Sequence, residues 1–225
     1  MAKYLIHAVP QRMWYVNEYL IPSMVQQGIA RDDISITCDT EKKGCLEMFM
    51  QSCLSVPKKG YTWHLQDDII ISSRFREETE KRRSGIVCGL STVYDHGNPT
   101  GVVKDPTKMW YSFPCIRIPN DIAHEVAEWF YNEVVPDKSN EEYQRFIQAK
   151  KFDDSFFRAY IENYRQDVRI LNLAPNIVDH IDYLIGGMVA NYGRDKNPIS
   201  VFWEEPELTE QLAQVMMERC LQNSK

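Results

Sequence analysis

The sequence predicts an α/β fold with a mostly parallel central sheet. In the first third of the chain, apolar runs of strand length alternate with segments whose apolar residues recur at helical spacing. The order strand, helix, strand, helix, strand is typical of βαβ units, in which each crossover helix brings the next strand into parallel alignment. A chain of 225 residues, of which 44% are hydrophobic and 12% aromatic, fits one domain with a sizeable core.

Local signals define the elements of the first half. The run KYLIHAVP is a strand that a proline ends, and the helix after it has apolar residues three to four positions apart and stops at Gly28. Pro22 is expected to kink that helix. The expected elements are strands over Lys3–Pro10 and Ile34–Asp39, helices over Gln11–Gln27 and Gly44–Leu54, and a third strand that contains TWHLQDDIII.

The second half is less regular. A proline inside MWYSFPCIRIP predicts an edge or bent strand, because proline cannot donate a hydrogen bond to its neighbour. Asn120 is expected to be the N-cap of a helix over Asp121–Val134, and Asp95–Lys108 has the composition of an exposed loop. The other expected elements are a short helix in RFREETEKRR, strands in GIVCGLSTVY and VRILNLAP, and helices over Asp154–Tyr164 and Glu207–Leu221.

Charge and cysteine content exclude several classes of protein. With 26 basic and 32 acidic residues, the net charge of -6 argues against a protein that coats nucleic acid non-specifically. RFREETEKRR, Lys58–Lys59 and Lys150–Lys151 could form a local basic patch, although solvated surface is the favoured interpretation. Six cysteines without a CxxC pair argue against zinc and for reduced thiols in a cytoplasm. No segment approaches the roughly 20 apolar residues of a membrane span, so we expect a soluble cytoplasmic protein.

Two adjacent carboxylates, Asp67 and Asp68, interrupt the apolar third strand. They repel each other, and each costs several kcal/mol if it is buried without a partner. A positive partner is therefore expected, and a hard divalent cation suits carboxylate oxygens. Ligands bind at the carboxyl ends of parallel strands, where Arg12 could meet a phosphate or a base and Asp39 a ribose hydroxyl or base N–H. The alternative is a turn with two solvated aspartates.

At this point the sequence resembles glycosyltransferases of the A-type fold. Those enzymes carry Asp-x-Asp or Glu-Asp-Asp at the end of a central strand, where the last acid holds Mn²⁺ or Mg²⁺ against a nucleotide diphosphate. QDD matches this motif, with Asp68 as the implied metal ligand. Gln66 replaces the first acid, and this departure leaves the role of Asp67 open.

Two later stretches extend the resemblance over most of the chain. KFDDSFFRAYIE is similar to the acid pair that opens a helix after the acceptor region of inverting members, which implies Asp154, or else Asp153, as the base. NLAPNIVDHIDYLIGG is similar to a segment whose histidine, here His180, completes the metal site. From the residues alone, the acid pair could equally cap a helix, and His180 could be a hydrogen-bonded core histidine.

The resemblance implies a three-layer α/β/α sandwich and one glycosyltransferase domain over residues 1–225, with a nucleotide-sugar half (1–90) and an acceptor half with the C-terminal helix (91–225). The implied enzyme is inverting and moves a sugar from a nucleotide diphosphate-sugar, with UDP-sugar preferred, to a hydroxyl group. The acceptor would be a saccharide or, as in the phage enzymes that the chain resembles in size, a hydroxymethylated pyrimidine in DNA. The residues expected around the donor are Ala8, Val9, Arg12, Asp39 and Asp67.

Three alternatives stay open. A nucleotidyltransferase shares the α/β plan, but it normally has a glycine-rich loop after the first strand, and HAVPQR has no glycine. A metal-dependent nuclease would use the Asp pair with a nearby lysine, and no lysine stands just after the acids. A binding domain without catalysis would keep the fold and the nucleotide-sugar site alone.

Overall fold

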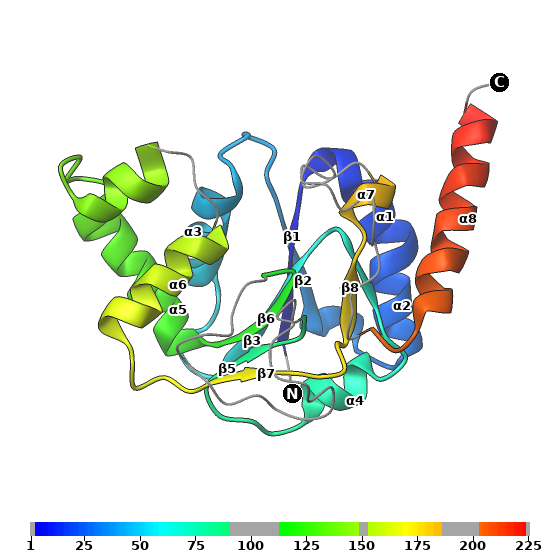
Figure 1. Ribbon diagram of the computed structural model, residues 1–225, viewed down its shortest axis with the longest axis horizontal. Helices are drawn as coiled ribbons and strands as arrows, with labels where there is room; N and C mark the ends of the chain where they lie inside the picture. Colours follow the sequence, from blue (N-terminus) through cyan, green and yellow to red (C-terminus); the bar gives the residue numbers. More distant parts are fainter. Residues whose placement is uncertain (1–2, 91–112, 149–152, 186–202, 224–225) are drawn as a thin grey trace.

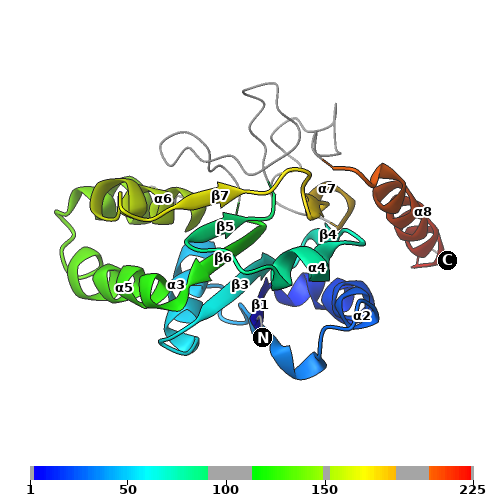
Figure 2. The same ribbon diagram turned by 90° about the horizontal axis from the view of Figure 1, so that it is seen from below.

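The computed structural model describes residues 3–90, 113–148, 153–185 and 203–223. These residues form a six-stranded sheet with helices on both faces and a separate two-stranded sheet (Figures 1 and 2). The expected loop over Asp95–Lys108 and the Lys150–Lys151 pair lie outside the described residues.

The central sheet has the strand order β2-β1-β3-β6-β5-β7. β1 pairs in parallel with β2 and β3, β5 pairs in parallel with β7, and β6 runs antiparallel between β3 and β5. Five strands therefore share one direction, so the expected mixed α/β fold with a mostly parallel sheet is confirmed. The strands are β1 (Lys3–Ala8), β2 (Ile34–Cys38), β3 (Tyr61–Gln66), β5 (Ile86–Cys88), β6 (Cys115–Pro119) and β7 (Ile170–Asn172).

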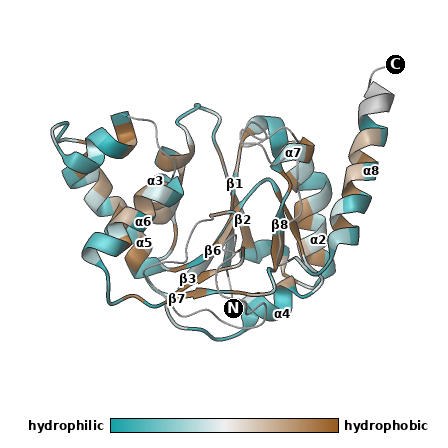
Figure 3. Cartoon of the chain, in the orientation of Figure 1, coloured by the Kyte–Doolittle hydropathy of each residue, from teal (hydrophilic) through white to brown (hydrophobic). Residues whose placement is uncertain are grey.

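Two hydrophobic cores, one on each face of the sheet, hold the layers together. On one face, strand residues such as Trp63 and Leu65 pack with Met24 and Phe75. On the other, Ile116 and its neighbours on the sheet pack against the second group of helices. Figure 3 shows the apolar strands between helices whose outer faces are polar. The first face carries α1 (Met13–Tyr15), α2 (Ile21–Gln26), α4 (Phe75–Glu80) and α8 (Pro206–Asn223), and the second carries α3 (Cys45–Ser55), α5 (Asn120–Trp129) and α6 (Asp153–Tyr164).

The third strand is not continuous through the carboxylates, as TWHLQDDIII had suggested. β3 ends at Gln66, and after Asp67 and Asp68 the chain enters β4 (Ile69–Ile71), which leaves the central sheet. β4 pairs antiparallel with β8 (Val178–His180) in the two-stranded sheet. The two acids therefore occupy the turn between two sheets, where both side chains can point at groups from elsewhere in the chain.

Three other expectations need correction. β6 is central, not an edge strand, because Pro114 precedes it and Pro119 is its last residue, so neither proline interrupts the ladder. The first helix contains a π-helical turn, Val16–Leu20, directly before the segment with Pro22, in place of a simple kink. Asn120 does not cap α5. It is the first helical residue, and its side-chain oxygen accepts a hydrogen bond from Thr62.

Among the described residues, no helix is long and apolar enough to cross a bilayer.

Candidate functional site

The carboxylates meet other polar groups at the carboxyl edge of the parallel strands. Asp67 and Asp68 follow β3, Val9 follows β1 and Asp39 follows β2. Because β2, β1 and β3 are adjacent and parallel, these residues lie at one edge of the sheet, as the sequence predicted.

Arg12 is the positive partner of the carboxylate pair. Its guanidinium group places Nη2 2.7 Å from Asp67 Oδ1 and Nη1 3.2 Å from Asp68 Oδ2. The two aspartates are only 1% and 6% exposed. A planar guanidinium that contacts both carboxylates offsets much of the cost of burying two like charges side by side. Arg12 is therefore a positive partner for both aspartates, a role for which the sequence had suggested a metal ion.

Asp67 is held on both oxygens. Its Oδ2 accepts a hydrogen bond from the backbone N–H of Val9 at 2.7 Å, and its Oδ1 faces Arg12. Burial and the charge of Asp68 raise the pKa of Asp67 to about 6, although Arg12 and the Val9 N–H lower it. Asp67 therefore joins the ends of β1 and β3 and has no oxygen directed away from the chain.

Asp68 faces two cationic or potentially cationic groups with its two oxygens. Oδ2 faces Arg12, and Oδ1 lies 3.2 Å from Nε2 of His180, the last residue of β8. Burial by itself would raise the pKa of Asp68, but His180 and Arg12 outweigh burial, so the pKa is lowered and the group stays ionised. Asp182 stands on the other side of the imidazole, 4.0 Å from Nδ1.

Asp39 shapes the loop that leads into α3. Its two carboxylate oxygens accept hydrogen bonds from the backbone N–H groups of Lys43 and Gly44, at 2.8 and 2.9 Å. Its own N–H donates to the carbonyl of Ala8, which closes β1 against β2. Gly44 has φ +92, a conformation that favours glycine. Asp39 thus lies where the sequence placed it, with its carboxylate engaged by its own loop.

Asp153 and Asp154 begin α6, on the face of the sheet that carries α3. Asp153 is buried, and burial, with further repulsion from Asp154 and Asp68, raises its pKa to about 7. Asp154 is more exposed. One of its oxygens accepts from the N–H and hydroxyl of Ser155, so it caps its own helix.

A histidine pair lies behind this edge, with His64 buried and His7 half-buried, and no pattern in the sequence indicated it. His7 Nε2 is 3.0 Å from His64 Nδ1, and the rings stack with centroids 5.2 Å apart. The Ser52 hydroxyl donates to the Met48 carbonyl, so it accepts from His7 Nδ1–H, 3.3 Å away. His7 Nε2 then accepts from His64 Nδ1–H, which leaves both rings neutral. Burial lowers the pKa of His7 to about 4, and burial with the charge of His7 lowers that of His64.

Asp68 and His180 are the two residues of this edge whose spacing fits a divalent cation. Within the described ranges, no cluster of three or more His, Cys, Asp or Glu side chains could hold a metal. Asp68 Oδ1 and His180 Nε2, 3.2 Å apart, nevertheless match the spacing of about 3 Å between adjacent ligands of an octahedral cation bound at about 2.1 Å. Such a cation commonly has one or two protein ligands and completes its shell with substrate phosphates and water.

No protein-family model and no curated protein matches this sequence. Solved structures with some similarity include HddC from Yersinia pseudotuberculosis, at 9% identity and a TM-score of 0.34, over 60% of this chain and 86% of that one. Another is the apo-form glycosyltransferase GlyE of Streptococcus pneumoniae TIGR4, at 7% identity and a TM-score of 0.36, over 77% of this chain and 54% of that one. Likeness of this degree leaves the function to be inferred from the site itself.

Proposed function

We propose that the protein transfers a sugar from a nucleotide diphosphate-sugar, preferably a UDP-sugar, to an acceptor hydroxyl. The observation that carries the proposal is the Asp68–His180 pair at the carboxyl edge of β3. One carboxylate oxygen faces a histidine while the other is fixed by Arg12, so two ligand atoms are held in place for a cation. Asp153 is a buried carboxylate with its pKa raised to about 7, and Asp68 contributes to that rise.

Asp68 and His180 would hold Mn²⁺ or Mg²⁺. When bound there, the cation would neutralise the donor's diphosphate and stabilise the negative charge of the leaving group. Asp182, close to the far nitrogen of His180, favours the tautomer that presents Nε2 as a ligand.

Arg12 is assigned a positioning role in place of the direct nucleotide contact suggested by the sequence. Its two ion pairs fix the rotamers of Asp67 and Asp68 and turn one oxygen of Asp68 toward His180. The donor would then lie against the backbone at Ala8 and Val9, with Asp39 at the nucleoside end. This keeps the nucleotide-sugar half within residues 1–90 and the acceptor half within residues 91–225.

Asp153 is the better candidate for the general base, although the sequence alone had favoured Asp154. A base works best when its pKa is close to the operating pH, and burial brings Asp153 to about 7. Asp154 already accepts two hydrogen bonds from Ser155. In the proposed reaction, the carboxylate of Asp153 takes the proton of the acceptor hydroxyl, whose oxygen forms the new bond to the anomeric carbon as the bond to the diphosphate breaks. Attack from the opposite face inverts the anomeric configuration.

The test is a panel of nucleotide diphosphate-sugars with Mn²⁺ or Mg²⁺, followed by release of the nucleoside diphosphate. Acceptors in the panel are saccharides and DNA that contains hydroxymethylated pyrimidines. Release of the nucleoside diphosphate by the wild type but not by Asp68→Ala supports the proposal. The anomeric coupling constant of the product, measured by NMR, reports whether the configuration is inverted. Binding without turnover would indicate a non-catalytic domain, release of pyrophosphate from a nucleoside triphosphate would indicate a nucleotidyltransferase, and DNA cleavage would indicate a nuclease.

A further inference from the structure

A cavity opens at the opposite, amino edge of the central sheet. It has a volume of about 500 Å³ and lies where β3, β5 and β7 begin and the antiparallel β6 ends. Its lining includes the basic residues Lys58, Lys59 and Arg169. Tyr61, which is 44% exposed, also lines it. The six positions from Tyr61 to Asp67 along β3 correspond to about 20 Å, so this cavity is remote from the carboxylate pair.

A buried cation lies directly behind the cavity wall. Arg117 of β6 is 5% exposed, and its guanidinium carbon is 4.3 Å from the centroid of the Tyr61 ring. It donates to the carbonyl oxygens of Arg83 and Gly85, and its Nε–H has no hydrogen-bond partner. No carboxylate forms an ion pair with Arg117 within the described part of the chain. An uncompensated buried charge is costly, and an anion in the adjoining cavity would reduce that cost.

Of the two acids that line the cavity, Asp167 is paired with a cation and Asp121 has no such partner in the residues that the structure describes. Asp167 accepts two hydrogen bonds from the guanidinium of Arg165, at 3.0 and 3.2 Å, and Asp121 accepts one from the N–H of Ile122. Among the described residues, neither Lys59 nor Arg169 has a carboxylate partner, and Lys58 has only a long contact of 3.8 Å to Glu128. The free positive charge therefore exceeds the free negative charge at this edge, in a chain whose net charge is -6.

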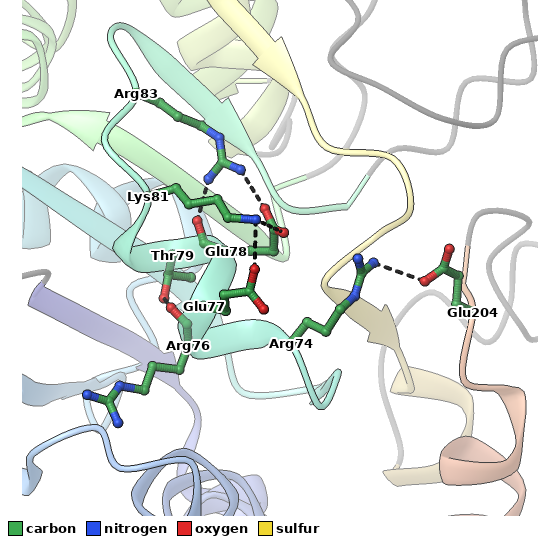
Figure 4. Close-up of polar contacts among 8 residues, drawn as sticks. All are labelled: Arg74, Arg76, Glu77, Glu78, Thr79, Lys81, Arg83 and Glu204. Atoms are coloured by element: carbon green, nitrogen blue, oxygen red, sulfur yellow. Dashed lines mark hydrogen bonds and ion pairs between the residues drawn. The ribbon is translucent and has the colours of Figure 1, made fainter.

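The neighbouring basic stretch RFREETEKRR does not account for this patch. Figure 4 shows Lys81 and Arg83 directed at Glu78, and Arg74 directed at Glu204. These cations are neutralised by acids on or near α4, as expected for a solvated helix face. Arg82 is the one cation of the stretch without an ion pair among the described residues, and it does not line the cavity.

We propose that this amino-edge cavity binds a nucleoside phosphate, with its phosphate between Lys59 and Arg169 and its base stacked on Tyr61. Lysine and arginine supply charge-assisted hydrogen bonds to phosphate oxygens, and an exposed aromatic ring is the usual platform for a base. Arg117 beneath the ring adds positive potential without reaching the ligand. A free nucleotide and a single-stranded oligonucleotide present the same chemistry. This site is independent of the proposed transfer reaction.

The experiment measures binding of UMP, inorganic phosphate, uridine and an oligo(dT) of eight nucleotides by calorimetry. Asp68→Asn protein with EDTA is used throughout, so that the carboxylate site does not contribute. We expect Lys59→Gln with Arg169→Gln to weaken UMP binding about ten- to hundredfold, Tyr61→Leu to weaken it about tenfold, and Lys138→Gln, a change at an exposed lysine elsewhere, to leave it unchanged.

Each outcome decides a point. Tighter binding of UMP than of either phosphate or uridine supports joint recognition of phosphate and base. Tighter binding of oligo(dT) than of UMP identifies a strand as the natural occupant, and equal binding identifies a nucleotide. No binding of any probe, or binding that the Lys59, Arg169 and Tyr61 variants leave intact, would overturn the proposal. Glycosyl transfer by wild-type protein is measured separately, so failure of this site and failure of the proposed reaction remain distinguishable.

Discussion

Asp68 Oδ1 lies 3.2 Å from Nε2 of His180, although the two residues belong to distant parts of the chain. The β4–β8 ladder produces this contact, because its register pairs Ile69, the residue after Asp68, with His180. The backbone of Asp68 is fixed there too, since its carbonyl accepts a hydrogen bond from the N–H of Ile181. The cation site proposed for these two residues therefore depends on a two-stranded sheet outside the main one.

Loss of either ligand tests the cation site. We expect Asp68→Ala to abolish Mn²⁺-dependent binding of UDP-sugar, because it removes a charged ligand, and His180→Ala to weaken it less. Calorimetry with and without Mn²⁺ measures both effects, and Asp32→Ala, at an exposed aspartate, serves as the control. If both variants bind UDP-sugar and Mn²⁺ like the wild type, the site is elsewhere.

Removal of Arg12 separates its two possible roles. Arg12→Ala leaves Asp67 and Asp68 buried without their cation, so we expect a loss of about 3–5 kcal/mol in the free energy of unfolding. Denaturant titration measures this loss, and a double-mutant cycle with Asp67→Ala should show strong coupling. A variant of unchanged stability whose Kd for nucleotide-sugar rises about ten- to hundredfold would instead support direct contact with the nucleotide.

Asp153→Asn should reduce activity and increase stability at high pH. The change removes the proton acceptor with almost no change in volume, so we expect kcat to fall about 10²–10⁴-fold while donor binding persists. The wild-type rate should rise as pH increases through about 7, the pKa of Asp153, as its carboxylate ionises. Asp154→Asn is the matched control, and a larger loss of kcat in that variant would return the base to Asp154.

The pKa shift of Asp153 also predicts how the stability of Asp153→Asn should differ from that of the wild type at each pH. The pKa of Asp153 is raised from 3.8 in the unfolded chain to about 7, so the folded state binds the extra proton between these pH values. This group's contribution to stability is therefore present at low pH and is lost as pH rises to 7. We expect Asp153→Asn to have a higher Tm than the wild type at pH 8, with the difference narrowing toward pH 4. A lower Tm at pH 8 would contradict the raised pKa.

The His7–His64 pair should have the opposite pH dependence. The pKa of His7 falls from 6.5 in the unfolded chain to about 4 in the fold, so the unfolded state binds more protons between these values and stability decreases as pH falls. His7→Gln removes this contribution, so the variant should lose less stability than the wild type between pH 6.5 and 4.5. Parallel denaturant titrations at several pH values measure the difference, and identical pH slopes would argue against a neutral pair.

Local residue patterns were enough to predict the fold class and the edge of the sheet at which the carboxylates lie. Strand and helix signals are local, so the strands at Lys3 and Ile34 and the helix after Gly44 could be located from neighbouring residues. Parallel βαβ connections bring the strand ends to one edge, which is why Val9, Asp39 and Asp67 can be grouped from the sequence.

The contacts that each of these side chains makes could not be predicted from local patterns. The ion pairs of Arg12 depend on the conformation of a short turn after β1, and the contact of His180 depends on the register of β4 against β8. The burial of Asp153, which sets its pKa, comes from α6 packing against α3 and the sheet. Such contacts join residues far apart in the chain, and their geometry follows from packing and hydrogen bonding, which no local pattern of residues records.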